Sequence, residues 1–435
     1  MEDHQELHLP LPLHVAMKIF AHLPISCVAQ LRLVCKSWRS LLSSSSFLAS
    51  LELEYKALCR SGRACREWWF VMAASTATTI IPFSHDLLAF SYPLQWRPFR
   101  LPMHTSPKLG DLLLRVASSQ SLVPSVMNML VASAGGLMCA VVKGAPPVAP
   151  HNSSPSLISE LTYDMVVFNC LTGELKTLPR PSRLANKLIS SCLISMRAEE
   201  ERDTYRIILC DLKYREMEIY DSQMRSWRAG IGVRASDRAQ VAMSEIGFGG
   251  GMTNADVKIA DLLESDVMRY HKEEIAAYDA TKDRWRKAEL ALPRIAATEL
   301  LRSTVVKCGG GVYLVACLMK QAVRMEGYGV WKLEEEGGRG GLRWAESGRT
   351  PASMVEGFER IKFESPAFYD CRFVGGGLES EWVCMTGVHY MIGSRTRAEY
   401  WQPVLFNVRQ RQWHLLPPRH CLCIFPFYPH FTALP

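Results

Sequence analysis

The fold at the N-terminal end of this chain is decided by LPLHVAMKIFAHLP (residues 11–24) and LRLVCKSWRSLLSSSSF (residues 31–47). In the first stretch, Val15, Ile19 and Leu23 recur every four residues, which places their side chains on one face of a helix. Pro24 follows directly, and a proline disfavours helical geometry in the residue before it. The stretch therefore predicts an amphipathic helix that ends before Pro24.

The second stretch continues an apolar series with a near-helical period from Val28 to Leu42. It predicts a second amphipathic helix that begins near Ser26 and ends in the serine run 43–46. Phe47 and Leu48 then provide a last apolar anchor. Periodicity alone favours a small helical hairpin that packs on the rest of the protein.

The order of residue types indicates more than a hairpin, because both stretches resemble the F-box family. Leu11-Pro12 and Leu23-Pro24 match its paired Leu-Pro steps, and residues 34–39 (VCKSWR) match its VCK-x-W stretch. Leu13-His14 departs from the acidic pair that many members carry at this point. A missing negative charge in the first helical turn costs roughly 0.3–1 kcal/mol.

This resemblance implies a three-helix F-box at residues 9–50, whose apolar side chains bind a Skp-type adaptor. So small a unit cannot bury all its apolar surface, and an exposed apolar patch indicates a partner. Trp38 is the expected hot spot, because aromatic anchors carry much of the binding energy in interfaces. The adaptor contacts expected from the resemblance are Leu11, Pro12, Ile19, Leu23, Pro24, Leu31, Val34, Cys35 and Trp38.

Beyond a helical connector at residues 51–66, a degenerate unit recurs at 166–181, 218–230, 276–294 and 404–418. In each copy an apolar run ends in an aromatic residue plus Asp or Asn, and Leu or Trp follows six residues later. Asp and Asn favour turns, so each copy predicts a β-hairpin. Unrelated hairpins in a sandwich are the alternative. The structural positions are Asn169, Asp221, Trp227, Asp279, Trp285, Asn407 and Trp413.

Glycine clusters followed by aromatic-Asp and Trp resemble kelch repeats, and their combination with an F-box resembles the plant F-box/kelch-repeat proteins. The resemblance implies an all-β propeller over residues 67–430, behind a polar tail at 1–8. Closing the hairpins into a ring would protect the sheet edges. Six blades are expected, with seven as the alternative.

Composition excludes several other classes of protein. The net charge of +7 is spread over short stretches, so no nucleic-acid-binding arm is expected. Residues 116–142 carry no charge, but Gly135-Gly136 divides them into two expected strands, so no membrane span is expected. The 14 irregularly spaced cysteines and the polar N-terminus fit reduced thiols in the cytoplasm or nucleus. No metal site, cofactor motif or catalytic motif is predicted.

The expected function is that of a substrate-recognition subunit of an SCF-type E3 ubiquitin ligase. The F-box would bind the Skp adaptor and, through it, a cullin–RING ligase, while the propeller holds a protein substrate for ubiquitination and proteasomal degradation. The chain itself would be non-catalytic. The alternative is a non-degradative interaction scaffold that uses the same two modules.

Overall fold

A computed structural model describes most of the regular elements of this 435-residue chain. The described residues are 11–23, 27–28, 31, 34–60, 69–74, 87–91, 95–99, 131–143, 163–169, 172, 174–185, 192–199, 204–211, 216–231, 259–265, 267–271, 274–291, 293, 298–320, 324–336, 341–355, 369–375, 380–391, 397–400, 403–416 and 421–427.

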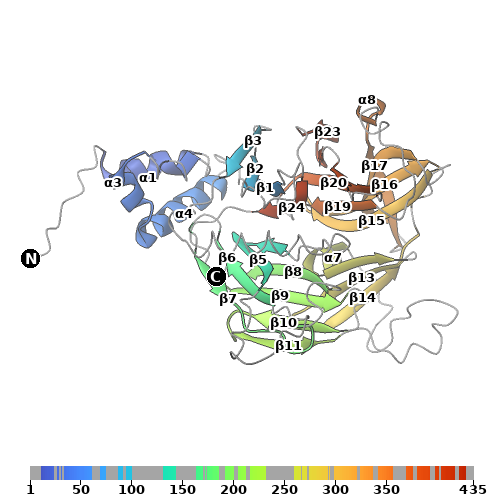
Figure 1. Cartoon of the computed structure of the whole chain (residues 1–435), viewed down its shortest axis with the longest axis horizontal. Helices are drawn as coiled ribbons and strands as arrows, with labels where there is room; N and C mark the ends of the chain where they lie inside the picture. The colour runs from blue at the N-terminus through green and yellow to red at the C-terminus, as the bar shows by residue number, and fades with distance from the viewer. Residues whose placement is uncertain are drawn as a thin grey trace, which may run out of the picture.

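The N-terminal region is helical, as expected, and lies to one side of an all-β region (Figure 1). Helix α1 (Leu13–His22) begins after Pro12 and ends where Leu23 turns extended, with ψ at 148°. The second expected helix is wrong as a single element. Cys27, Val28 and Leu31 are helical, but Val34 lies in a turn and Cys35 is extended, so α3 (Lys36–Leu41) starts anew. Periodicity does not reveal this break, because the apolar series continues through it.

The serine run at 43–46 does not simply end a helix. Helix α4 (Ser45–Arg60) starts within it, and the backbone N–H of Leu48 donates to the carbonyl of Ser44 at 3.0 Å. Phe47 and Leu48 are buried, which confirms the predicted anchor. The helix runs on without a break through residues 50 and 51, where the expected domain boundary lies.

The described residues of the all-β region form six antiparallel sheets, named A to F in chain order. Sheet A contains β24 (Cys421–Phe427), β1 (Trp69–Ala74), β2 (Leu87–Ser91) and β3 (Gln95–Phe99). Sheet B contains β4 (Val131–Ala134), β5 (Leu137–Lys143), β6 (Tyr163–Phe168) and β7 (Leu175–Thr177). Sheet C contains β8 (Cys192–Glu199), β9 (Thr204–Asp211), β10 (Met217–Asp221) and β11 (Ser226–Gly230).

Helix α7 (Ile259–Glu264) precedes the three strands of sheet D, which are β12 (Val267–His271), β13 (Glu274–Asp279) and β14 (Arg284–Glu289). Sheet E contains β15 (Thr298–Cys308), β16 (Gly311–Lys320), β17 (Arg324–Glu336) and β18 (Gly341–Arg349), and helix α8 (Ala352–Val355) follows it. Sheet F contains β19 (Tyr369–Gly375), β20 (Trp382–Met391), β21 (Arg397–Tyr400), β22 (Val404–Asn407) and β23 (Gln412–Leu415).

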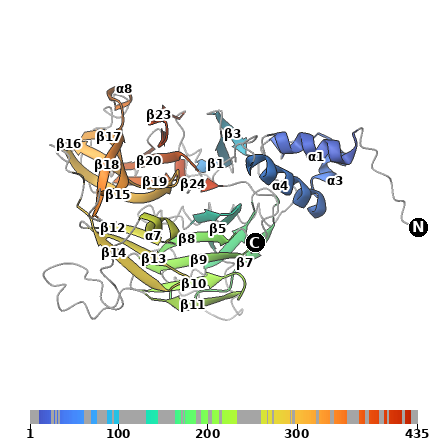
Figure 2. The ribbon, with the colours of Figure 1, turned by 180° about the vertical axis from the view of Figure 1, so that it is seen from behind.

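The sheets follow one another around a ring, which Figures 1 and 2 show from opposite sides. Strands β24, β4 and β8 contact one another in that order, and β15, β19 and β24 do the same on the other side. The ring closes because β24 pairs with β1, so sheet A joins the two ends of the all-β region. This arrangement is a β-propeller, and it protects the sheet edges as expected.

Four of the six sheets have the complete four-stranded form of a propeller blade among the described residues: A, B, C and E. The expected six blades are therefore not all present in that form. Sheet D has three strands. In sheet F, β21 and β22 both pair with β20, and the register passes from Val388↔Tyr400 to Met385↔Val404. Strands β21 and β22 thus together form the third strand of sheet F, and the shift in register corresponds to one extra residue on their side.

The hydrophobic core lies between successive sheets. Cys139 of sheet B packs with Ile207 of sheet C, and Ile219 of sheet C packs with Tyr278 of sheet D. Clusters of the same kind join D to E and E to F. The pair Gly135-Gly136 turns the chain between β4 and β5 with φ of 55° and 81°, which confirms the two strands and tight turn predicted there.

Candidate functional site

The N-terminal helices are held together by a small aromatic core. The ring of Phe20 meets Trp38 edge-on at 5.4 Å between centroids and Phe47 at 6.1 Å. Ala16 and Ala21 of α1 are buried on the same side of the unit. Trp38 is half-buried, so it contributes to this core as well as to the surface.

Most of the apolar residues expected to contact an adaptor point outward. The side chains of Leu11, Ile19 and Val34 are 39%, 44% and 64% exposed. The expected set also includes the exposed Pro12 and Cys35 and the half-buried Leu23, Leu31 and Trp38, whereas Pro24 lies outside the described residues. Leu13 is 52% exposed and was not in the expected set, although it belongs to the quoted Leu-Pro-Leu start.

Cys35 has a structural role besides its exposure. Its backbone is extended and its Sγ accepts the backbone N–H of Trp38 at 3.4 Å, so Cys35 is the N-cap of α3. The cap positions Trp38 in the first turn of the helix, directly against Phe20.

The Asp and Asn residues of the repeated unit organise the hairpin turns. Oδ1 of Asp221 accepts the backbone N–H groups of the second and third residues after it, at 2.9 and 3.2 Å. Oδ1 of Asp279 does the same at 3.0 and 3.1 Å, and Oδ1 of Asn407 at 3.0 and 2.8 Å. In the first unit, Asn169 is fully buried and its Oδ1 accepts the N–H of Thr172 at 3.4 Å.

A second feature of these turns was missed from the sequence. The fourth residue after the Asp or Asn has a positive φ: 53° at Arg225, 46° at Asp283 and 55° at Arg411. Such backbone favours Gly, Asn or Asp and is disfavoured for other side chains. The signal was Gly173, which stands at this position in the first unit, but one glycine among four copies did not reveal the rule.

The tryptophans return opposite the aromatic residue of the preceding strand, which gives three aromatic cross-strand pairs. The ring centroids are 5.3 Å apart for Tyr220 and Trp227, 5.1 Å for Tyr278 and Trp285, and 4.6 Å for Phe406 and Trp413. Such pairs are worth about 0.5–1.5 kcal/mol beyond the area that they bury.

Two of these tryptophans also join neighbouring sheets. Nε1 of Trp227 in sheet C donates to the carbonyl of Pro179, just beyond the last strand of sheet B, at 2.6 Å. Nε1 of Trp285 in sheet D donates to the carbonyl of Ile231, just beyond the last strand of sheet C, at 2.9 Å. These residues therefore position the sheets relative to one another.

Glu218 was not singled out from the sequence, yet its carboxylate accepts four hydrogen bonds from one segment of the chain. It is 1% exposed, and its carboxylate accepts the backbone N–H groups of Ser182, Arg183 and Leu184 at 2.8–3.0 Å and the hydroxyl of Ser182 at 2.7 Å. Burial alone would raise the pKa of Glu218, but these hydrogen bonds outweigh it and lower the pKa. A carboxylate inside the apolar run MEIYD was the available signal.

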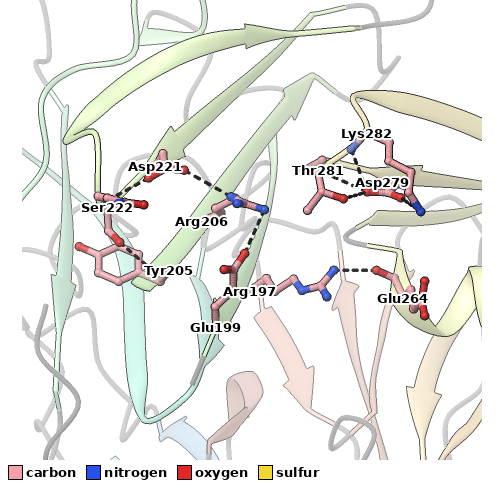
Figure 3. A network of polar contacts seen from close by, with 12 residues as sticks. Arg197, Glu199, Tyr205, Arg206, Asp221, Ser222, Glu264, Asp279, Thr281 and Lys282 are labelled. Atoms are coloured by element: carbon pink, nitrogen blue, oxygen red, sulfur yellow. Dashed lines mark hydrogen bonds and ion pairs between the residues drawn. The ribbon is translucent and has the colours of Figure 1, made fainter. Parts of the chain in front are cut away.

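A network of charged residues occupies one end of sheet C (Figure 3). Arg206 lies between Glu199 and Asp221, with N–O distances of 3.1 and 3.4 Å. Arg197 of β8 donates to the carbonyl of Glu264 at 2.7 Å, and Lys307 of β15 donates to the carbonyl of Ser265. Sheets C and E thus both supply a cation to the C-terminal end of α7, where the helix dipole favours positive charge.

The cysteines in apolar strands behave as hydrophobic side chains. Cys139, Cys210, Cys317 and Cys384 are buried. Burial raises the pKa of the Cys139 and Cys384 thiols and raises that of Cys210 to about 12, so these groups are thiols at neutral pH. Within the described residues there is no group of three or more His, Cys, Asp or Glu side chains that could hold a metal ion.

Residues 9–50 match the model of the F-box domain family, a range that includes α1, α3 and the first part of α4. These residues are an F-box domain. The F-box of this chain therefore precedes an all-β propeller. No helix in the described part of the chain is long and apolar enough to cross a membrane.

Comparisons of the whole chain found distant likenesses only. No curated protein matches the sequence. The chain is similar to the β-propeller domain of the trilobed protease from Pyrococcus furiosus, with 9% identity, coverage of 66% of this chain and 68% of that one, and a TM-score of 0.24. It is also similar to TolB from Acinetobacter baumannii, with 11% identity, coverage of 81% and 69%, and a TM-score of 0.30. The assignment of a propeller rests on the order and closure of the sheets.

Proposed function

We propose that this protein is the substrate-recognition subunit of an SCF-type E3 ubiquitin ligase. The F-box binds a Skp-family adaptor, which links the chain to a cullin–RING ligase, and the propeller holds a protein substrate. The observation that carries the proposal is the set of outward apolar side chains on the F-box, at Leu11, Ile19 and Val34. A partner that covers them would remove this apolar surface from water.

The expected contact set remains our proposal for the adaptor interface, with Leu13 added on account of its exposure. Full burial of a Val, Leu or Ile side chain is worth about 1.5–3 kcal/mol. Since Ile19 and Val34 are each about half exposed, covering them supplies roughly 1 kcal/mol apiece. Trp38 adds a ring that is already fixed by Phe20, so its ordering costs little on binding.

The chain's own contribution to ubiquitin transfer is proximity. A substrate held by the propeller stays near the ubiquitin-loaded enzyme on the same scaffold, so its lysines react as if in an intramolecular step. No residue of this chain makes or breaks a covalent bond in that mechanism.

We further propose that the propeller is of the kelch type and has six blades. The repeated Asp or Asn turn with its cross-strand Trp supports the first part. Six sheets around a closed ring support the second, since β21 and β22 together continue one strand of sheet F. In sheet D, α7 stands in chain order where the other sheets have a first strand.

The adaptor interface is tested with the full chain and purified Skp adaptor. The double variant Ile19→Asp/Val34→Asp places charges on two exposed positions, so the fold should persist while adaptor binding falls at least about a hundredfold, the effect of roughly 3 kcal/mol. Met224→Asp is the matched control, because Met224 is 73% exposed in a turn of sheet C. Unchanged binding by the double variant would refute the interface.

The ligase role is separated from the scaffold alternative by substrate lifetime. Proximity labelling with and without proteasome inhibition identifies partners of the propeller. A recruited substrate should persist longer in cells that carry the double variant than in cells with the unmodified protein. Equal lifetimes in both would favour a non-degradative scaffold.

A further inference from the structure

The junction between sheets C and D contains a carboxylate that satisfies three donors. Oδ1 of Asp283 accepts the hydroxyl of Tyr278 and, at 3.2 Å, the backbone N–H of Ile231. Oδ2 of the same residue accepts from Nη1 of Arg228 at 3.4 Å. Tyr278 and Asp283 belong to the β13–β14 hairpin, whereas Arg228 and Ile231 belong to β11 and the residue after it. One carboxylate of sheet D therefore balances the charge of Arg228 and satisfies the backbone N–H of Ile231 at the edge of sheet C.

The junction between sheets B and C follows the same plan. Trp227 donates to the carbonyl of Pro179, just as Trp285 donates to the carbonyl of Ile231. The two bonds therefore show which residues occupy equivalent positions in the two junctions. Counting along the chain from the two tryptophans, Tyr220 corresponds to Tyr278 and Arg225 to Asp283. Counting from the two carbonyl residues, Pro179 and Ile231, Lys176 corresponds to Arg228.

The central carboxylate is thus replaced by a guanidinium. Arg225 has the same backbone as Asp283, with φ of 53° against 46°. The Tyr220 hydroxyl is buried and has no hydrogen-bond partner among the described residues. Within the same residues, neither Lys176 nor Arg225 takes part in an ion pair. The exchange therefore leaves a hydroxyl and two cations without the acceptor that the next junction provides.

The two cations influence each other electrostatically. Burial of the Lys176 amine, and then the charge of Arg225, lower the pKa of Lys176. Arg225 also influences Tyr220: burial raises the pKa of that hydroxyl, and the positive charge of Arg225 opposes the rise. Positive φ at this turn position is shared by Asp283 and Arg411, so the backbone of the turn is constant while its side chain differs between junctions.

We propose that the junction of sheets B and C binds an acidic group of a protein partner, whose oxygens take the place that the Asp283 carboxylate fills in the next junction. The planar guanidinium of Arg225 and the ammonium of Lys176 suit a carboxylate or a phosphate. Arg225 is exposed and Lys176 is half-buried, so the anion reaches them from solvent. The inference goes beyond the proposed function, because anion binding at this junction needs no adaptor.

The chain offers a matched pair of variants for the test. Arg225→Asp restores the carboxylate that Asp283 supplies in the neighbouring junction. Arg411→Asp is the control, because Arg411 has the same turn position and a φ of 55°, but its aromatic partner Phe406 has no hydroxyl to satisfy. Arg225→Gly removes the guanidinium and suits the positive φ at this position. It replaces Arg225→Asp in the experiment if that variant does not fold.

The first measurement is the thermal midpoint of the full chain as inorganic phosphate is titrated at constant ionic strength. Phosphate should raise the midpoint of the unmodified chain and of Arg411→Asp equally. In Arg225→Asp the midpoint without phosphate should be higher, and the apparent phosphate affinity at least about tenfold weaker, as expected for one lost charge-assisted contact. Arg225→Gly should show the same loss of affinity. An equal phosphate response in all variants would overturn the site.

The second measurement identifies the source of the anion. A labelled peptide with phosphoserine, the same peptide with Asp, and one with Ser are titrated against the unmodified chain and Arg225→Asp. Binding of the phosphoserine or Asp peptide that Arg225→Asp loses supports an acidic protein segment. A phosphate response without binding of either acidic peptide would overturn the assignment to a protein partner. Adaptor binding, measured on the same samples, should not change, so failure here is distinct from failure of the ligase proposal.

Discussion

Replacement of Glu218 by Gln is the sharpest test of how the sheets are joined. The Glu218 carboxylate accepts four hydrogen bonds from the segment 182–184, which connects sheet B to sheet C. The amide of Gln has one oxygen, which can accept two of them, and its N–H₂ group faces the remaining donors. Two charge-assisted bonds are lost, each worth roughly 1.5–3 kcal/mol. We therefore expect Glu218→Gln to lower the free energy of unfolding by about 3–6 kcal/mol at pH 7.

The same variant has a defined pH dependence. The hydrogen bonds lower the pKa of Glu218 in the folded protein below 4.5, the ordinary value of a glutamate side chain. A depressed carboxyl pKa contributes stability that is fully present above the unfolded pKa and is lost as the pH falls through the folded value. The difference between the unmodified chain and Glu218→Gln should therefore be constant from pH 7 to about 5.5 and shrink at lower pH.

Urea titration followed by tryptophan fluorescence measures both effects. Glu174→Gln is the control, because Glu174 is exposed at the start of the neighbouring β7 hairpin strand and should change stability by less than about 0.5 kcal/mol. The reasoning is refuted if Glu218→Gln matches this control at pH 7, or if its deficit grows as the pH falls.

Three further substitutions test other contacts. Cys35→Ala removes the cap of α3 and should destabilise the F-box by about 0.5–2 kcal/mol and weaken adaptor binding. Cys35→Ser keeps a capping side chain, so the stability and the adaptor binding should both be retained. Thermal melts and adaptor titrations measure these two effects. Trp285→Phe keeps an aromatic ring but loses the hydrogen bond to the Ile231 carbonyl, so urea denaturation should show a free energy of unfolding lower by about 1 kcal/mol. An unchanged free energy would exclude this bond as a link between sheets C and D. Gly348→Ala places a Cβ 2.8 Å from the Phe406 ring and should cost about 1–3 kcal/mol in the same assay, with Gly341→Ala, which meets only the flexible Glu336 side chain, as the tolerated control.

The sequence predicted those features that depend on neighbours along the chain. The Asp and Asn positions predicted the hairpins because each turn is closed by bonds to residues two and three positions later. The outward positions of Ile19 and Val34 agree with the exposed apolar patch that the F-box resemblance implied. The break at Cys35 escaped prediction, because a side-chain cap overrides an apolar period that continues through it.

Features that join distant segments could not be predicted from one sequence. Glu218 binds the segment that connects sheet B to sheet C, and Trp227 and Trp285 bond to residues just beyond the last strand of the preceding sheet. The pairing of β24 with β1 joins the two ends of the all-β region. Such contacts depend on how the sheets are arranged around the ring, and hydrophobic period carries no information on that arrangement.

The pairing of β24 with β1 also sets the order in which the two modules can become active during synthesis. The F-box leaves the ribosome before any strand, whereas β24 leaves after every other strand of the six sheets. A nascent chain therefore has its F-box helices while sheet A still lacks its fourth strand. On the proposal that the F-box binds an adaptor, a product that stops at residue 416 would compete for that adaptor without a closed propeller.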